Sequence, residues 1–291
     1  MKNLKNLISG TILEEPAKQI YSSWVQRFKS KLSTAVVFIH LPKCGGTSLM
    51  KALRESFRAD AATFDVHTLR AALAEQMGER DTPGFYGKSR DYQEFLLRYY
   101  LNLKSDFISG HFPISADILK EYSETHSFFT LFREPLARFQ SQYIYDKMFA
   151  IREIGQSQQL LTKEEREEEL QSYLKSYRAR FVSNIYTWML GGPVGSSEGE
   201  FLEQAKENLE FFSCIGFQDQ MDRFEKDIDR HLGIPLSIGV KNTTPFQADI
   251  LKVDIDDYRS LFTNEVKEQI RELCVNDCDL YNYARNRSGE Q

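Results

Sequence analysis

Residues 35–53 read AVVFIHLPKCGGTSLMKAL, and this stretch decides the fold class. It opens with a short, almost wholly apolar and β-branched run, which is typical of a strand buried on both faces of a parallel sheet. A loop with two glycines follows, and the helical spacing of apolar residues resumes at Thr47. The stretch therefore predicts a strand, a glycine-containing loop and a helix.

The same pattern occurs again along the chain. Apolar strand candidates at residues 128–132 and 211–216 are each followed by a helical stretch, and residues 105–111 form a shorter strand candidate. Strands that alternate with helices imply a parallel sheet. We expect an α/β protein, a P-loop-like three-layer sandwich with a central parallel sheet flanked by helices. In such sheets, ligands bind beyond the carboxyl ends of the strands.

The composition is that of a folded, globular chain. The 291 residues include 37 Lys and Arg against 42 Asp and Glu, a net charge of −5 with histidine neutral. A broad electrostatic grip on nucleic acid or an anionic membrane needs an excess of positive charge, so neither partner is expected. No apolar run is long enough for a membrane span, the N-terminus is a poor signal peptide, and four cysteines are too few for a disulfide framework. We expect a cytoplasmic protein with no integral membrane segment; a lumenal enzyme lacking its anchor is the alternative.

The glycine-containing loop has the features of an anion-binding site. Gly45 and Gly46 let the backbone curl closely around a ligand, and the following helix begins with unpaired N–H groups and a positive dipole end. Thr47 and Ser48 can donate hydrogen bonds from their hydroxyls, and Lys43 can place a positive charge against the same oxygens. The alternative is an ordinary Gly-Gly turn with a Thr or Ser helix cap.

A nucleoside triphosphatase or kinase is the first rival. Its P-loop, G-x-x-x-x-G-K-[ST], needs a lysine directly after the second glycine and a hydroxyl on magnesium. Here Thr47 follows Gly46, and the nearby Lys43 precedes both glycines. The loop therefore suits a 5′-phosphate whose departure is stabilised by protein charge, and no metal is expected.

A resemblance to a known family rests on two motifs. Residues 39–49, IHLPKCGGTSL, resemble the 5′-phosphosulfate loop of the sulfotransferases that use 3′-phosphoadenosine 5′-phosphosulfate (PAPS). The likeness is greatest to the carbohydrate type, which includes the heparan sulfate 2-O-sulfotransferases. Those enzymes carry a second motif, a strand followed by R-[DE]-P and a helix with a serine further on. Residues 132–143, FREPLARFQSQY, are similar to it, with Ser141 eight residues after Arg133.

The second motif has a physical rationale. Eight residues are a little over two helical turns, so Arg133 and Ser141 can approach one face of the junction between strand and helix. A guanidinium fork and a hydroxyl there can bind the 3′-phosphate that distinguishes PAPS from ATP. The alternative is that Arg133 pairs with Glu134 or another nearby acid and that Ser141 is incidental.

The resemblance implies a PAPS-dependent sulfotransferase whose acceptor is a hydroxyl, expected to belong to a carbohydrate or glycoconjugate. It implies that Lys43 stabilises the departing phosphate and that the loops and two helix N-termini hold the nucleotide. Several relatives carry threonine at the position of Cys44. The missing hydroxyl is expected to cost no essential contact, because the backbone of the loop makes most of the contacts to the cofactor. The implied cofactor-binding residues are Lys43, Cys44, Gly45, Gly46, Thr47, Ser48, Arg133, Ser141, Asn242 and Thr243.

A base must deprotonate the acceptor hydroxyl. Histidine suits this role because its unperturbed pKa of about 6.5 leaves it largely neutral at cellular pH. His111 ends a strand candidate on the side of the cofactor loop, and the resemblance places the catalytic base in this Gly-His segment. A purely structural histidine is the alternative. Of the others, His40 is assigned to packing or loop support and His231 to a solvated helix end, while His67 and His126 have no motif around them.

The domain organisation follows from these motifs. We expect an N-terminal helical lead-in over residues 1–33 and a single sulfotransferase-like domain over residues 34–291. Because the cofactor motifs lie outside them, segments near residues 61–104 and 145–200 are interpreted as acceptor-side insertions.

The acceptor is poorly specified by the sequence. Lys175, Arg178 and Arg180, interleaved with aromatic residues, either contact an anionic sugar chain or form an ordinary helix face. Two other functions remain as alternatives for the whole chain: a magnesium-dependent P-loop-type nucleotide kinase or NTPase, and a non-catalytic nucleotide-binding protein.

Overall fold

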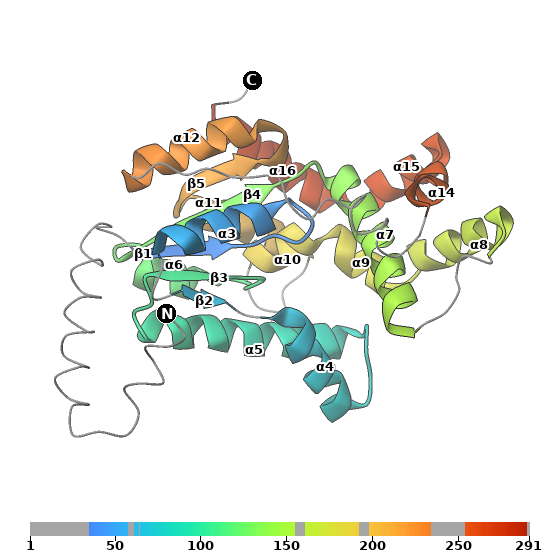
Figure 1. The fold of residues 1–291 in the computed structure, drawn as a ribbon, viewed down its shortest axis with the longest axis horizontal. Coiled ribbons are helices and arrows are strands. Elements are labelled where there is room, and N and C mark those ends of the chain that lie inside the picture. Colours follow the sequence, from blue (N-terminus) through green and yellow to red (C-terminus); the bar gives the residue numbers. More distant parts are fainter. Residues whose placement is uncertain are drawn as a thin grey trace, which may run out of the picture.

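The central element is a five-stranded parallel sheet, with strand order β2-β3-β1-β4-β5. The computed structural model describes residues 35–57, 61–63, 65–154, 161–191, 198–233 and 254–289. The strands are β1 (Ala35–Ile39), β2 (Ala61–Thr63), β3 (Phe107–Gly110), β4 (His126–Phe132) and β5 (Phe212–Phe217). Figure 1 shows α12 beside β5 at one edge of the sheet and α5 at the other. The predicted α/β class with a parallel sheet flanked by helices is confirmed.

Helices connect and follow these strands. They are α3 (Gly46–Phe57), α4 (Val66–Met77), α5 (Pro83–Asn102), α6 (Ala116–Tyr122), α7 (Pro135–Ile154), α8 (Lys163–Leu174), α9 (Tyr177–Ser183), α10 (Ile185–Leu190), α11 (Glu198–Leu209), the 3-10 turn η2 (Gln218–Gln220), α12 (Met221–Leu232), α14 (Ile255–Ser260), α15 (Asn264–Leu273) and α16 (Val275–Arg287). None of the described helices is both long and apolar enough to cross a bilayer. The expected lead-in over residues 1–33 lies outside the described residues.

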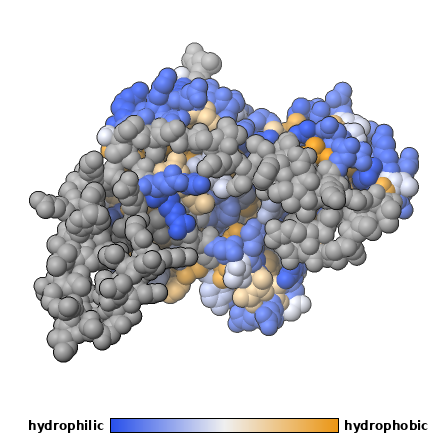
Figure 2. Space-filling model, in the orientation of Figure 1, coloured by the Kyte–Doolittle hydropathy of each residue, from blue (hydrophilic) through white to orange (hydrophobic). Residues whose placement is uncertain are grey.

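The first face of the sheet is covered by α3 and α12. Phe107 and Ser127 both pair with Val36, so the three side chains share a face. Phe57 of α3 stacks on Phe107 with ring centroids 5.3 Å apart, and His231 of α12 lies 2.7 Å from the Ser127 hydroxyl. Figure 2 shows that the outward surface of α12 is hydrophilic, as expected for a helix that buries only one stripe.

Helices α10 and α16 cover the opposite face. Phe132 at the end of β4 contacts Tyr186 of α10 and Tyr281 of α16, with ring centroids 5.0 and 6.4 Å apart. Because both faces are covered, β4 is buried along its whole length, and β1 is buried from Val36 to Ile39. This burial explains why apolar residues follow one another without alternation along β1 and, apart from Thr130, along residues 128–132 of β4. The sheet and its two helical layers form the predicted three-layer sandwich.

The segment near residues 61–104 contributes a strand to the central sheet. It contains β2, an edge strand paired in parallel with β3, besides α4 and α5. Part of the expected insertion is therefore part of the sheet. The three residues of β2 read AAT, too short a run to give a strand signal by itself.

Candidate functional site

Four strand ends meet at one large cavity. His40, His111, Arg133 and Gln218 directly follow β1, β3, β4 and β5, and all four line a cavity of about 1470 Å³. This volume exceeds the range of about 300–1,000 Å³ that is usual for a drug-sized ligand. The cavity lies where β1 is flanked by β3 on one side and β4 on the other. Ligands of open parallel sheets bind at this kind of position.

The cavity brings together most of the predicted site. Its lining includes Lys43, Gly45, Thr47, Ser48, His111, Arg133 and Ser141. The side chain of Cys44 is buried in the loop wall, and Gly46 packs against a neighbouring ring, so neither lines the cavity. Asn242 and Thr243 lie outside the described residues. The two motifs, 90 residues apart along the chain, therefore meet in one place.

The loop takes a backbone shape that curls toward α3. Lys43 and Gly45 have positive φ values of 64° and 86°. A lysine in this region is uncommon, because a Cβ atom disfavours the left-handed conformation. Helix α3 starts at Gly46, so Thr47 and Ser48 lie in its first turn. Both residues line the cavity there, at the positive end of the helix dipole.

Gly46 is required by a close approach. A Cβ atom at this position would lie 2.5 Å from Cδ2 of His40 and 3.0 Å from the Phe38 ring. The His40 ring lies between Phe38 and His111, with centroids 5.5 and 4.5 Å away. His40 thus supports the loop, as predicted, and it also contacts the proposed base.

A buried tyrosine joins the two motifs. The Tyr186 hydroxyl donates to the Arg133 carbonyl at 2.8 Å and accepts from the Arg133 N–H at 3.2 Å. Its oxygen also lies 3.1 Å from the Cys44 sulfur. Since the single phenolic proton is already donated to Arg133, the Cys44 thiol is the donor of this pair, and it shares its proton with the Pro42 carbonyl, 3.5 Å away. Burial raises the pKa of Cys44 to about 11, so its role here is structural.

Arg133 and Glu134 have separate partners. Arg133 Nη1 donates to the Lys43 carbonyl at 3.2 Å. The Glu134 carboxylate accepts from the N–H groups of Leu136 and Ala137 at 3.1 and 2.7 Å. The Glu134 carboxylate thus caps the N-terminus of α7, and the expectation that two helix N-termini hold the nucleotide stays a prediction.

Lys43 is held by an aromatic ring. Its Nζ lies 3.9 Å from the centroid of Tyr145, a cation–π distance. Burial lowers the pKa of Lys43 to about 8, while the nearby Asp146 carboxylate raises it and Arg133 lowers it further. A phosphate that binds beside this partly desolvated ammonium would stabilise its charged form.

His111 has a defined tautomer. Its Nδ1 lies 2.5 Å from the His40 carbonyl oxygen. A carbonyl can only accept, so Nδ1 carries the proton and Nε2 keeps the lone pair that a base needs. Burial lowers the pKa of His111 to about 4, with further lowering by Arg70, His67 and Lys43, while the bond to His40 raises it. The ring is therefore neutral at cellular pH.

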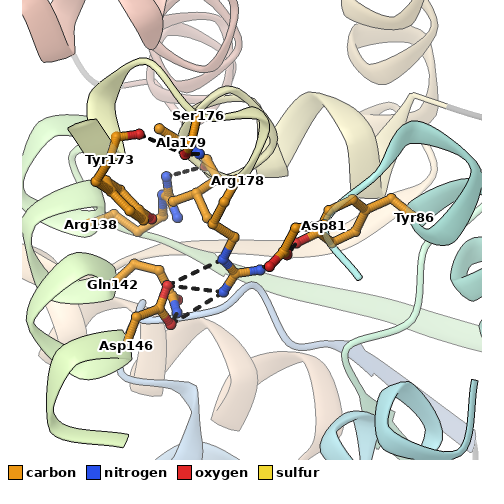
Figure 3. A network of polar contacts seen from close by, with 10 residues as sticks. Asp81, Tyr86, Arg138, Gln142, Asp146, Tyr173, Ser176, Arg178 and Ala179 are labelled. Atoms are coloured by element: carbon orange, nitrogen blue, oxygen red, sulfur yellow. Dashed lines mark hydrogen bonds and ion pairs between the residues drawn. The ribbon is translucent and has the colours of Figure 1, made fainter. Parts of the chain in front are cut away.

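The three basic residues at 175–180 differ in position. Arg178 lines the cavity, whereas Lys175 and Arg180 are exposed and do not. Figure 3 shows the Arg178 guanidinium between α7 and α5. It pairs with Asp146 at 3.1 Å and donates to the Tyr86 hydroxyl at 2.8 Å. Both of its partners belong to the protein, so Arg178 links α9 to α7 and α5 in the wall of the cavity.

Sequence reasoning missed two residues of this site. Tyr186 on α10 and Arg70 on α4 lie in segments without a motif. The tertiary fold brings Arg70 to the cavity wall and buries Tyr186 behind it, against Cys44 and Arg133. Tyr186 lies within the apolar helix α10. Its sequence context therefore does not distinguish a site residue from an aromatic residue of the core.

The comparisons leave the family open. No protein-family model matches the chain, and no characterised protein shows significant similarity to it. The described residues contain no group of three or more His, Cys, Asp or Glu side chains arranged to hold a metal ion. The assignment of an activity therefore depends on the geometry of the cavity.

Proposed function

We propose that the protein is a sulfotransferase, which moves the sulfuryl group of PAPS to a hydroxyl of a carbohydrate or glycoconjugate. One observation carries the proposal. His111, with Nε2 as the unprotonated nitrogen, shares a cavity with Lys43 of the first motif and with Arg133 and Ser141 of the second. Sulfuryl transfer needs these three functions in one place: a base, a positive charge at the leaving group, and a hold on the nucleotide.

Each residue has a part in the proposed displacement. His111 Nε2 takes the proton of the acceptor hydroxyl as its oxygen bonds to sulfur. The bond from sulfur to the bridging phosphate oxygen breaks, and its electron pair leaves with adenosine 3′,5′-bisphosphate. Lys43 and the first turn of α3 stabilise the charge that develops on that phosphate. Arg133 and Ser141 are assigned to the 3′-phosphate.

The size of the cavity favours a transferase with two substrates. Its volume of about 1470 Å³ exceeds the usual single-ligand range of about 300–1,000 Å³. Residues of the segments near 61–104 and 145–200 line it together with the two motifs. We therefore assign the nucleotide to the side of β1 and β4, and the acceptor to the side of α4, α5 and α9. A cytoplasmic location stays a prediction.

Titration with adenosine 3′,5′-bisphosphate tests the proposal directly. We expect saturable binding, measured by calorimetry, that is weakened by Arg133→Gln because the variant lacks the guanidinium. Adenosine 5′-monophosphate is the matched control, and its weaker binding would identify the 3′-phosphate as the recognised group. If the protein binds neither nucleotide, the proposal fails. Magnesium-stimulated ATP turnover would favour a kinase or NTPase, and bisphosphate binding without transfer to any acceptor would favour a non-catalytic protein.

A further inference from the structure

One face of α5 carries a stripe of exposed apolar side chains, called the α5 stripe below. Its members are Tyr92, Phe95, Tyr99 and the C-cap residue Leu103, and 37, 66, 51 and 57% of their surfaces are exposed. Spacings of three, four and four residues place them on one side of the helix. Among the described residues, Val275 is the only other large apolar residue that is exposed. Exposed apolar surface is therefore concentrated on α5.

The opposite face of α5 packs on the rest of the protein. Phe85, Leu97 and Leu101 belong to the hydrophobic core, and Tyr86 and Gln93 line the cavity. Figure 1 shows α5 running past β2 and β3 at the margin of the fold. The helix is thus anchored by its inner face, and the stripe is not needed to hold it there. Exposed apolar residues that gather in one patch mark an interaction surface.

The area of the stripe fits the centre of a weak dimer interface. Burying an aromatic side chain removes roughly 150–250 Å² from water, so the exposed fractions correspond to about 400 Å² for one stripe and about 800 Å² for two that face each other. Specific interfaces bury about 1,200–2,000 Å² in total. The polar residues that flank the stripe supply the rim of such an interface. We therefore expect a reversible dimer rather than a permanent one.

Part of the stripe is ordered before any partner binds. The Tyr99 ring meets the ring of Tyr100 edge-on, with centroids 5.6 Å apart, and Tyr100 in turn contacts the buried Phe112 ring at 6.3 Å. Near the other end, the Lys88 ammonium lies 5.5 Å from the ring centroid of Tyr92. A surface that is ordered in advance loses less side-chain entropy on association.

The charges at the two ends of the stripe select the partner and its direction. Asp91 lies beside the N-terminal end and Lys104 follows the C-terminal end, and both are exposed. Charges of both signs do not suit a polyanion such as nucleic acid. In a parallel pair of α5 helices, each charge would face the same residue of the second copy and repel it. In an antiparallel pair, Asp91 of each copy lies opposite Lys104 of the other, and the Phe95 and Tyr99 rings meet in the middle.

We infer that the α5 stripe is a self-association surface, through which two copies of this chain pair along antiparallel α5 helices. A two-fold interface joins the same patch of both subunits, so the patch must be complementary to itself. The stripe meets this condition, because its apolar middle faces an identical middle and its end charges are opposite in sign. The same helix carries Tyr86 and Gln93, so the dimer also braces one wall of each cavity. This inference does not depend on the proposed function.

Sedimentation of the full chain over a series of concentrations tests the inference. We expect an equilibrium between monomer and dimer with a dissociation constant on the order of 10 µM. Phe95→Gln and Tyr99→Gln should each raise that constant about tenfold or more, because aromatic residues at the centre of an interface contribute most of its affinity. Val275→Gln is the matched control. It removes the exposed apolar side chain that lies outside the stripe and should dimerise like the wild type.

An exchange of charges tests the direction of the pair. Asp91→Lys and Lys104→Asp each place like charges opposite one another and should raise the dissociation constant about three- to tenfold. The double variant Asp91→Lys/Lys104→Asp restores opposite charges and should return the constant close to its wild-type value. Lys104 has a positive φ of 54°, a conformation that aspartate tolerates, so its substitution adds no backbone strain.

The outcomes distinguish the possible occupants of the stripe. A wild type that stays monomeric at about 100 µM overturns the inference; a change in Trp24 fluorescence in Phe95→Gln would then assign the stripe to the N-terminal segment of the chain. A dimer that Phe95→Gln weakens no more than Val275→Gln also overturns it, because the contact then lies elsewhere. If the double variant does not recover, the antiparallel arrangement is wrong. Unchanged melting temperatures of the variants show that only the surface was altered.

Discussion

The phenolic oxygen of Tyr186 lies 2.8 Å from the carbonyl oxygen of Arg133. Through the same oxygen it contacts the Cys44 sulfur, so one hydroxyl fixes the phosphosulfate-like loop against the end of β4. Tyr186 is itself held from the opposite side, because the buried Asp277 carboxylate accepts its backbone N–H at 3.0 Å. The relative position of the two motifs thus depends on a helix that carries neither.

The variant Tyr186→Phe tests this connection. It leaves the Arg133 carbonyl and N–H without their partner, which we expect to cost about 1–3 kcal/mol of unfolding free energy and to weaken bisphosphate binding. Urea unfolding and calorimetric titration measure the two effects. Tyr283→Phe is the matched control, since it removes an exposed hydroxyl bonded to Glu210. Equal affinities of Tyr186→Phe and the wild type would contradict the role given to this hydroxyl.

The variant His111→Ala tests the base. We expect transfer to fall by about 10²–10⁴-fold, the usual contribution of a positioned general base, while bisphosphate affinity changes little. Sulfuryl transfer from labelled PAPS to an accepted sugar measures the first quantity. His231→Ala, at a residue that contacts Ser127 and does not line the cavity, should transfer at the wild-type rate. Near-normal transfer by His111→Ala would place the base elsewhere.

The affinity for the bisphosphate should depend on pH through Lys43. Burial lowers the pKa of this lysine to about 8 in the free protein. The protonated form binds the anion more tightly, so the affinity is greatest below pH 8 and falls as the pH rises through that value. Lys43→Arg keeps its charge throughout and should show a much flatter profile. Parallel profiles for the two proteins would mean that another group titrates.

The variant Gly46→Ala tests the packing of the loop on His40. Its new Cβ would come within 2.5 Å of the His40 ring, so that ring must move, and with it the backbone that orients His111. We expect a loss of about 1–3 kcal/mol in stability and slower transfer. Gly84→Ala in α5 is the control, because its Cβ would have no neighbour closer than 3.7 Å. A Gly46→Ala protein as stable and active as that control would refute the requirement for glycine.

The strands that the sequence predicted well are those with both faces buried. Residues 35–39 are apolar throughout and residues 128–132 are apolar except for Thr130, because helices cover them on both sides. Such a run can be recognised from the sequence alone. The position of His111 was predictable for the same reason, since it follows a short apolar strand. Arg70 and Tyr186 were not, because their roles depend on contacts between α4, α9, α10 and the sheet. The lead-in helix and the roles of Asn242 and Thr243 lie outside the described residues and stay predictions.

The two halves of the cavity are built by different means. Lys43, Arg133 and His111 follow the ends of β1, β4 and β3. These strands are hydrogen-bonded to one another, so the pairing within the sheet sets the spacing of the three residues. Arg70 and Arg178 stand on helices joined by side chains, among them the pair between Arg178 and Asp146. Substitutions in those helices are expected to reshape their side of the cavity while the side formed by the strand ends keeps its geometry. Under the proposed function, new acceptor preferences would therefore evolve by a few helix substitutions, because the residues assigned to the nucleotide and to the base stay in place.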